Sequence, residues 1–403
     1  MKFQFDDESF DFEALRAVGF AGYRGADLGE VLATASRIAD GDEAAWRREW
    51  QATAERVHAI GVDALAKGRT VSARDALLRA SNYYRTAEFY LRDHPAEDPV
   101  ARELSRRSRE TFAQAAELLD TPVREVAIPY QDTTLPGYLF LAGDSGAPRP
   151  TVIFNSGFDS TLEEAWFALA AAAVERGYHV LAFDGPGQGA VIREQGLPFR
   201  HDWEAVITPV IDFALRLPEV DPDRIAVYGY SLGGYLVARA AAFEHRIAAL
   251  VLNDGLFDYH AANTTAMPEF LAEWVESGRD AEALPVAGLI MAVNTGVRWA
   301  LRNGTWTFGA TSPADYIRKT KPYTLDGIAD RIDCPTLVFD AENDLFFKGE
   351  AQRVYAALTC PKELIVGTEA EGAGAHCHMG AMLLTHQRVF DWLDGIFEAL
   401  PTA

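Results

Sequence analysis

The sequence is poor in cysteine and in positive charge, and each shortage excludes a class of protein. Three cysteines in 403 residues make no paired framework, which suits a reducing cytoplasm better than a disulfide-stabilised secreted protein. Lysine and arginine number 37 against 59 aspartates and glutamates, so the formal net charge is −22. A surface of this sign disfavours nucleic acid and anionic membranes as partners, because phosphate binding needs clustered basic residues.

Long hydrophobic runs and a secretory signal are missing as well. No apolar stretch approaches the ~20 residues that a membrane-spanning helix needs. The first residues, MKFQFDDESFDFEAL, carry acids where a secretory signal has a basic and then an apolar segment. We therefore expect a cytoplasmic globular protein, long enough for one large domain and a smaller one.

The pattern of apolar residues changes near residue 122. Between about residues 28 and 120, segments such as DEAAWRREWQATAERVHAIGVDALAKG and SARDALLRASNYYRTAEFYLRD place apolar residues at helical spacing. Further on, short apolar runs alternate with helical ones, which is typical of a parallel sheet with helices on both faces. We predict an N-terminal helical domain over residues 1–122 and an α/β domain over residues 123–403.

Eight short segments are expected to form the strands of that sheet. The first two, EVAIPYQD and LPGYLFL, predict a hairpin, and six further apolar runs are separated by helices. In chain order the eight are residues 125–132, 135–141, 151–157, 178–184, 224–230, 248–254, 334–340 and 362–367. The interval after the sixth run is too long for one crossover, so we predict a helical lid insertion at about residues 256–325.

The most informative motif is a serine between glycines. Gly229-Tyr230-Ser231-Leu232-Gly233 fits G-x-S-x-G, a weak pattern alone in a chain with 32 glycines. Here the apolar run RIAVY enters the motif and the helical segment LGGYLVARAAAFE leaves it. Strand, tight turn and helix in that order are what a nucleophile elbow requires. We predict that Ser231 is a nucleophile at the carboxyl end of the sheet; the alternative is a small serine in a tight turn.

A serine nucleophile needs a base, and the base needs an acid to orient it. In an elbow fold these partners follow the serine in the order acid, then histidine. The segment DAENDLFF places Asp344 just past the strand CPTLVFD, where a carboxylate can reach an imidazole. Asp340 is better interpreted as the end of the strand and Glu342 as solvent-facing, so we predict Asp344 as the acid.

EGAGAHCHMG places two histidines on either side of Cys377. His376 lies in the loop before the last helix and can turn toward the serine, whereas His378 is expected in the first turn of that helix. We predict His376 as the base. A metal site is the alternative, because His-x-His beside a cysteine also suits a metal. No second ligand cluster occurs and His386 is interpreted as helix surface, so we expect neither metal nor cofactor.

An oxyanion hole should accompany the nucleophile. The elbow offers the backbone N–H of Leu232, and the loop after TVIFNSG offers that of Phe158. Downstream, Thr161 and Glu164 fit a capping box at the start of the next helix. We interpret Ser160, Glu163 and Glu164 as capping and solvation, and leave the role of Asp159 open.

With this serine motif followed by an acid and a histidine, residues 123–400 resemble the α/β-hydrolase family. The segments FNSGFDSTLEEAW, FDGPGQG and GYSLGGYLVARAAAFE, behind a helical region containing LLRASNYYRTAEFYLR, are similar to one subgroup. It includes 2,6-dihydroxypseudooxynicotine hydrolase, fungal hydrolases that shorten polyketide chains and FrsA-like esterases. The resemblance implies a triad of Ser231, Asp344 and His376. Where the family has a GGLDSTKEE-like segment this chain has NSGFDSTLEE, so a serine replaces one oxyanion-loop glycine and a leucine replaces the lysine.

The resemblance also implies a reaction class. Members of the subgroup cut carbon–carbon bonds of β-dicarbonyl or acyl-aromatic small molecules, and cleavage of an ester, thioester or lactone is the runner-up. Acyl transfer or cyclisation by the same triad is a third option, and a hydrolase fold that only binds is the alternative of another class. A homodimer built through the helical region is also implied. The aromatic residues of the helical region and the insertion are expected mostly in the core, with a few along the pocket. They are Trp46, Trp50, Tyr83, Tyr84, Phe89, Trp274 and Trp299.

Overall fold

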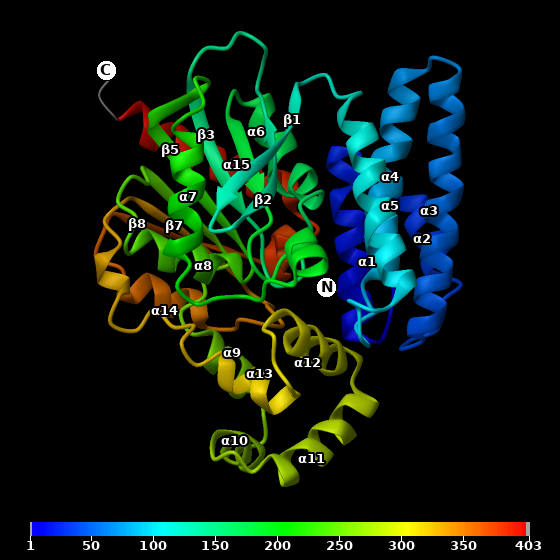
Figure 1. Cartoon of the computed structure of the whole chain (residues 1–403), viewed down its shortest axis with the longest axis vertical. Helices are drawn as coiled ribbons and strands as arrows, with labels where there is room; N and C mark the ends of the chain where they lie inside the picture. The colour runs from blue at the N-terminus through cyan, green and yellow to red at the C-terminus, as the bar shows by residue number, and fades with distance from the viewer. Residues whose placement is uncertain (1, 400–403) are drawn as a thin grey trace.

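A single eight-stranded sheet lies at the centre of the protein, seen in a computed structural model that describes residues 2–399 (Figure 1). Its strands are β1 Val123–Tyr130, β2 Thr133–Phe140, β3 Arg149–Asn155, β4 His179–Phe183, β5 Val220–Tyr230, β6 Ala249–Asn253, β7 Thr336–Ala341 and β8 Lys362–Gly367. The order across the sheet is β1-β2-β4-β3-β5-β6-β7-β8. This is the α/β-hydrolase fold, and the predicted sheet is confirmed.

Six of the strands run parallel, and their apolar composition follows from burial on both faces. β3 to β8 pair in parallel, while the hairpin β1–β2 joins β4 in the antiparallel sense. One face packs against α7 Glu204–Ala214 and α8 Gly233–Ala241, and the other against the segment around α6 Ala171–Glu175 and α15 Met382–Glu398. Because both faces are covered, the carboxyl edge of the parallel strands is the accessible place for chemistry.

The N-terminal region consists of helices that stand beside the sheet (Figure 1). They are α1 Glu8–Gly19, η1 Phe20–Tyr23, α2 Leu28–Ala35, α3 Glu43–Ala66, α4 Thr70–Glu88 and α5 Pro99–Ala116. Helical structure thus begins about 20 residues earlier than the periodicity indicated, because α1 is short and starts at an Asp7 cap. The aromatic side chains of Trp46, Trp50, Tyr83 and Tyr84 form the region's own core. The domain division at residues 122 and 123 stays a prediction.

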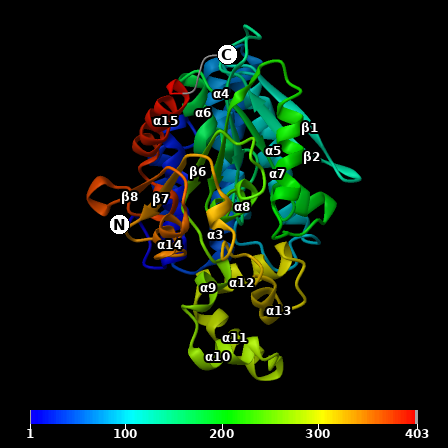
Figure 2. The same ribbon diagram turned by 90° about the vertical axis from the view of Figure 1, so that its left-hand side faces the viewer.

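A second helical group interrupts the sheet between β6 and β7. It comprises α9 Tyr259–Thr264, α10 Glu269–Glu276, α11 Asp280–Val293, α12 Thr295–Thr307 and α13 Pro313–Lys319. Both views place α10 and α11 at the extremity of the molecule, away from the sheet (Figures 1 and 2). The remaining elements are η2 Trp166–Ala170, η3 Val191–Gln195, η4 Ala329–Arg331, α14 Glu350–Ala357, η5 Glu369–Glu371 and η6 His376–His378. Among residues 2–399, no helix combines the length and apolar character that crossing a bilayer demands.

Candidate active site

Ser231 lies on the sharp turn between β5 and α8. Its φ of 60° falls in the left-handed region, a conformation that costs a non-glycine residue about 1–3 kcal/mol and is concentrated at functional sites. A hydrogen bond from its N–H to the Asn253 carbonyl (2.6 Å) holds the turn. The flanking glycines are required by close approach, since a side chain at Gly229 would collide with the Gly233 carbonyl and one at Gly233 with the Asn155 carbonyl.

The structure brings together the three side chains that the sequence singled out. His376 Nε2 lies 2.8 Å from Ser231 Oγ, and His376 Nδ1 lies 2.8 Å from Asp344 Oδ2. The backbone N–H groups of Phe346 and Phe347 donate to Asp344 Oδ1 at 2.6 and 3.0 Å. Hydroxyl, imidazole and carboxylate therefore form one continuous hydrogen-bonded chain.

Electrostatics reinforce this chain. Burial lowers the pKa of His376, but the charge of Asp344, the neighbouring Cys377 and the hydrogen bonds to the two carboxyl groups together outweigh burial and raise that pKa well above its usual value. Burial likewise raises the pKa of Asp344, yet the charge of His376 and the N–H of Phe346 hold it well below its usual range. The carboxylate is thus kept ionised beside the imidazole, the condition for stabilising an imidazolium.

A second carboxyl group, missed from the sequence, also contacts the imidazole. Asp254 Oδ2 lies 2.9 Å from His376 Nδ1 and accepts a hydrogen bond from the Cys377 N–H at 2.8 Å. Asp254 is fully buried and directly follows β6, the neighbour of the serine-bearing strand. The signal was present, because the segment AALVLND ends on an acid at the same sheet edge, but a triad needs only one acid.

The other polar residues of EGAGAHCHMG are occupied inside the protein. His378 is buried, with Nε2 2.9 Å from the Asp340 carbonyl oxygen; its expected place in the last helix was wrong, because α15 starts only at Met382. Asp254, His376 and Cys377 offer three potential metal-ligand atoms within 4.8 Å of one another. Burial raises the pKa of the Cys377 thiol to about 12, so a thiolate ligand is costly there and the group fits a hydrogen-bonded site better than a metal site.

The loop after β3 packs against the turn that carries Ser231. A side-chain carbon at Gly157 would lie 3.0 Å from the Leu232 nitrogen, so the next residue, Phe158, begins beside the serine. Leu232 caps the N-terminus of α8, where N–H groups lack an intrahelical acceptor. Asn303 of α12 donates to the Phe158 carbonyl at 3.2 Å. The two N–H groups predicted for the oxyanion hole therefore lie on adjoining segments.

Buried charges fix this loop to the N-terminal helices, and the expectation of solvated acids was wrong. Arg16 of α1 contacts Asp159 at 2.6 Å and Glu164 at 2.8 Å, and Arg85 of α4 contacts them at 3.3 and 3.2 Å. Arg85 also reaches Glu13 at 2.9 Å. Part of the capping role holds, since Glu164 accepts from the Thr161 N–H at 2.9 Å; Ser160 and Glu163 are buried as well.

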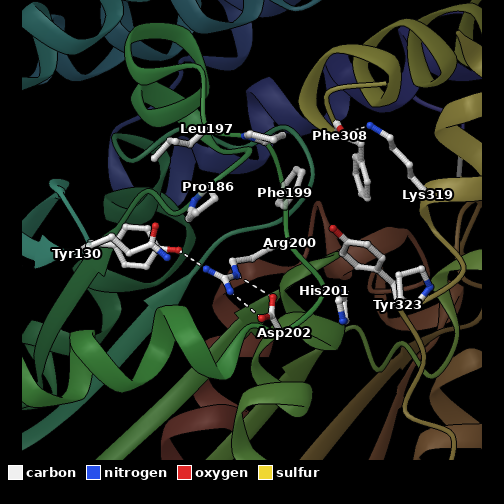
Figure 3. Close-up of a pocket in the computed structure, with 13 residues that line it drawn as sticks. Tyr130, Pro186, Leu197, Phe199, Arg200, His201, Asp202, Phe308, Lys319 and Tyr323 are labelled. Carbon is white, nitrogen blue, oxygen red and sulfur yellow. Dashed lines mark hydrogen bonds and ion pairs between the residues drawn. The ribbon is translucent and has the colours of Figure 1, made fainter. Parts of the chain in front are cut away.

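Aromatic rings surround Phe158, and a cavity of about 520 Å³ opens beside them. The rings within 6.5 Å of Phe158 belong to Phe199, Tyr259, Trp299, Phe308 and Tyr316. Figure 3 shows two of them in the cavity wall, with Arg200 held by Asp202 on one side. The lining includes none of the three triad candidates, so the cavity lies beside Phe158 and does not enclose the candidates themselves.

The chain is similar to known hydrolases in sequence and in fold. The chain is 39% identical to 20-hydroxy-prefusarin hydrolase FUS2 of Gibberella moniliformis, over 98% of this chain and 97% of the relative. It is 37% identical to hydrolase acrC of Aspergillus aculeatus, over 98% of both chains. The structure of 2,6-dihydroxy-pseudo-oxynicotine hydrolase shares the fold, with a TM-score of 0.75, 21% identity and coverage of 96% of this chain and 97% of that one.

Fold and relatives together define an enzyme of the α/β-hydrolase class. The family model of the FrsA-like esterases matches residues 35–269, which include the loop after β3 and the turn that carries Ser231. The chain belongs to this family. Its curated relatives FUS2 and acrC are themselves named hydrolases.

Proposed function

We propose that the protein is a serine hydrolase acting on a carbonyl substrate, with Ser231 as nucleophile, His376 as base and Asp344 as orienting acid. The observation that supports this best is the unbroken chain of 2.8 Å contacts from Oγ through the ring to the carboxylate. A binding protein has no need to keep three such groups in register.

The mechanism follows from the positions of these atoms. His376 Nε2 takes the proton of Ser231 as the oxygen attacks the carbonyl carbon, and Asp344 stabilises the imidazolium. The N–H groups of Leu232 and Phe158 bind the alkoxide; each such donor is worth about 3–4 kcal/mol of barrier. Collapse expels the leaving group, which receives the proton from His376, and water then clears the acyl-enzyme by the same steps in reverse.

We propose that the bond cleaved is a carbon–carbon bond of a β-dicarbonyl or acyl-aromatic small molecule. The carbanion that leaves can delocalise as an enol or a phenolate, so protonation by His376 is enough to release it. The rings around Phe158 supply a flat, apolar wall that suits a planar polyketide or heteroaromatic compound. The names of two similar proteins, 20-hydroxy-prefusarin hydrolase and 2,6-dihydroxy-pseudo-oxynicotine hydrolase, support a substrate of this kind.

An ester, thioester or lactone is the alternative substrate, since the same acyl-enzyme would form. Wild type and Ser231→Ala should be compared on a β-diketone, on an aryl ester and with a fluorophosphonate that labels nucleophilic serines. We expect Ser231→Ala to lose labelling and about 10⁴-fold or more of the turnover, while Ser277→Ala, an exposed lid serine, stays at the wild-type rate. Cleavage of the ester alone would refute the carbon–carbon assignment, and turnover unaffected by Ser231→Ala would refute the triad.

We also propose a cytoplasmic homodimer assembled through the N-terminal helices. The low cysteine content supports the compartment. The outer lid helix α10 lies away from α3 and α5 (Figure 1), whereas the end of α11 meets the start of α3 through Arg298, which contacts Glu43 and the Met291 carbonyl. A dimer of this kind therefore leaves α10 free.

A further inference from the structure

Two buried carboxyl groups meet at one imidazole nitrogen, one more than a triad requires. Asp344 Oδ2 and Asp254 Oδ2 lie 2.8 and 2.9 Å from His376 Nδ1. A ring nitrogen carries a single hydrogen, so it cannot neutralise two full negative charges. The side chains of both acids are at most 2% exposed, and no solvent screens their mutual repulsion.

The two acids differ in what else they contact. Asp344 accepts two backbone hydrogen bonds, from Phe346 and Phe347, in addition to the imidazole. Asp254 accepts one, from Cys377, and its Oδ1 has no hydrogen-bond partner among residues 2–399. A negative charge is therefore better stabilised on Asp344, and a proton costs less on Asp254.

We propose that Asp254 is a positioning residue that stays protonated in the resting enzyme and hydrogen-bonds Asp344, so that the pair holds one negative charge behind His376. The inference rests on the proposed function only in that His376 acts as the base. The proton remains on Asp254 through the cycle, and the one transferred between Ser231, His376 and the leaving group is a different proton. The hydrogen bond from the neutral acid draws part of the negative charge of Asp344 away from the imidazole. The pKa of His376 is therefore lower than it would be beside Asp344 alone, and the imidazolium gives its proton to the leaving group more easily.

The surroundings agree with this assignment. Burial raises the pKa of Asp254, whereas that of Asp344 is held low in part by a hydrogen bond from Asp254. Two carboxyl groups can share a hydrogen bond only if one of them keeps its proton. The titratable groups facing the pair from the neighbouring elements are His376, Cys377 and His378 of η6, Tyr228 of β5 and Asp340 of β7.

The test measures the pKa of His376 directly, by ¹⁵N-histidine NMR titration in wild type, Asp254→Asn and Asp254→Ala, with His376→Gln to identify the resonance. Asparagine mimics the protonated acid and can still donate to Asp344, so we expect a pKa close to that of wild type. Alanine removes the donor and leaves the full charge of Asp344 facing the ring, so the pKa should rise by about one unit. A lower pKa in both variants would mean that Asp254 is ionised, and no change in either would mean that it is uncoupled; each result overturns the proposal.

A second measurement covers the case in which Asp254→Ala fails to fold. The rate of Ser231 phosphonylation should fall about tenfold or less in Asp254→Asn, but by about 10³–10⁴-fold in Asp344→Asn, where the orienting charge is lost. Equal losses, or a larger loss in Asp254→Asn, would contradict the assignment. The NMR titration can be read even in a protein that turns over nothing, so failure of this inference and failure of the proposed function are distinguishable.

Discussion

The two helical regions flanking the carboxyl edge of the sheet are attached to the α/β core in different ways. The N-terminal helices reach the loop after β3 through buried ion pairs of Arg16 and Arg85, and α1 also places Phe12 with its ring centre 6.1 Å from that of His376. In the lid, α12 makes the inner contact through Asn303, whereas the outer helix α11 buries only Ala283.

This difference in attachment indicates which of the two helical regions the active site depends on. A buried charge that loses its partner cannot be stabilised by water, so the position of the loop after β3 depends on the packing of α1 and α4 against it. The outer lid is apolar yet exposed, with Leu289 and Val293 uncovered, and changes there reach the site only indirectly. We infer that the N-terminal helices are part of the catalytic unit and that α10 and α11 are accessory.

The largest effect should come from breaking the buried ion network. Arg85→Ala leaves Glu13, Asp159 and Glu164 with one arginine among three acids, and we expect a loss of about 3–5 kcal/mol in the free energy of unfolding. Urea denaturation followed by circular dichroism measures it. Arg279→Ala is the control, because Arg279 pairs with Glu282 on the exposed lid surface, where such pairs contribute little. Equal stability of the two variants would remove the distinction between the regions.

The next effect is a pH dependence in a second N-terminal contact. His386 of α15 is fully buried, bonds Tyr23 of η1 at 2.8 Å and the Ala168 carbonyl at 2.6 Å, and has a pKa lowered to about 4 by burial. The unfolded chain binds the proton near pH 6.5 and the folded one only near pH 4, so stability falls as the pH drops through this window.

The expected contribution of His386 between pH 7.5 and pH 5 is about 2 kcal/mol, at 1.36 kcal/mol per pH unit below 6.5. Urea titrations at both pH values should show that His386→Gln loses less stability on acidification than wild type does. His245→Gln, at an exposed histidine, should follow wild type. A variant at position 386 that retains the full acid sensitivity would show that the proton goes elsewhere.

The sequence alone was sufficient to predict those features that depend on the order of neighbouring segments along the chain. Ser231 could be predicted because a strand, a glycine-flanked turn and a helix are contiguous in the sequence. The order acid then histidine indicated Asp344, just past one apolar strand, and His376, in the loop that follows the next strand. Asp254 could have been found by the same rule, since it too ends a strand at that edge. Their catalytic roles remain proposals that the experiments above address.

The contacts between distant segments could not be predicted. Arg16 and Glu164 are 148 residues apart in the chain, and Tyr23 and His386 are 363 apart. Acids in a polar stretch are interpreted as solvated because most are, and nothing local in DSTLEE indicates arginines from another region. The sequence likewise predicts His386 on the helix surface, and the prediction is wrong because Tyr23 and the Ala168 carbonyl, both distant in the chain, bind its buried ring. A single sequence gives periodicity and order, but not the partner of a buried polar group.

The smallest effect should come from the outer lid. Leu289 and Val293 are mostly exposed, so replacing both by serine should change the free energy of unfolding by no more than about 0.5 kcal/mol and should leave phosphonylation of Ser231 unaltered. If the dimer forms through the N-terminal helices, light scattering should also give the same mass for the variant and for wild type. A variant that dissociates would place the dimer contact on α11 and make the lid, not the N-terminal region, the assembly surface.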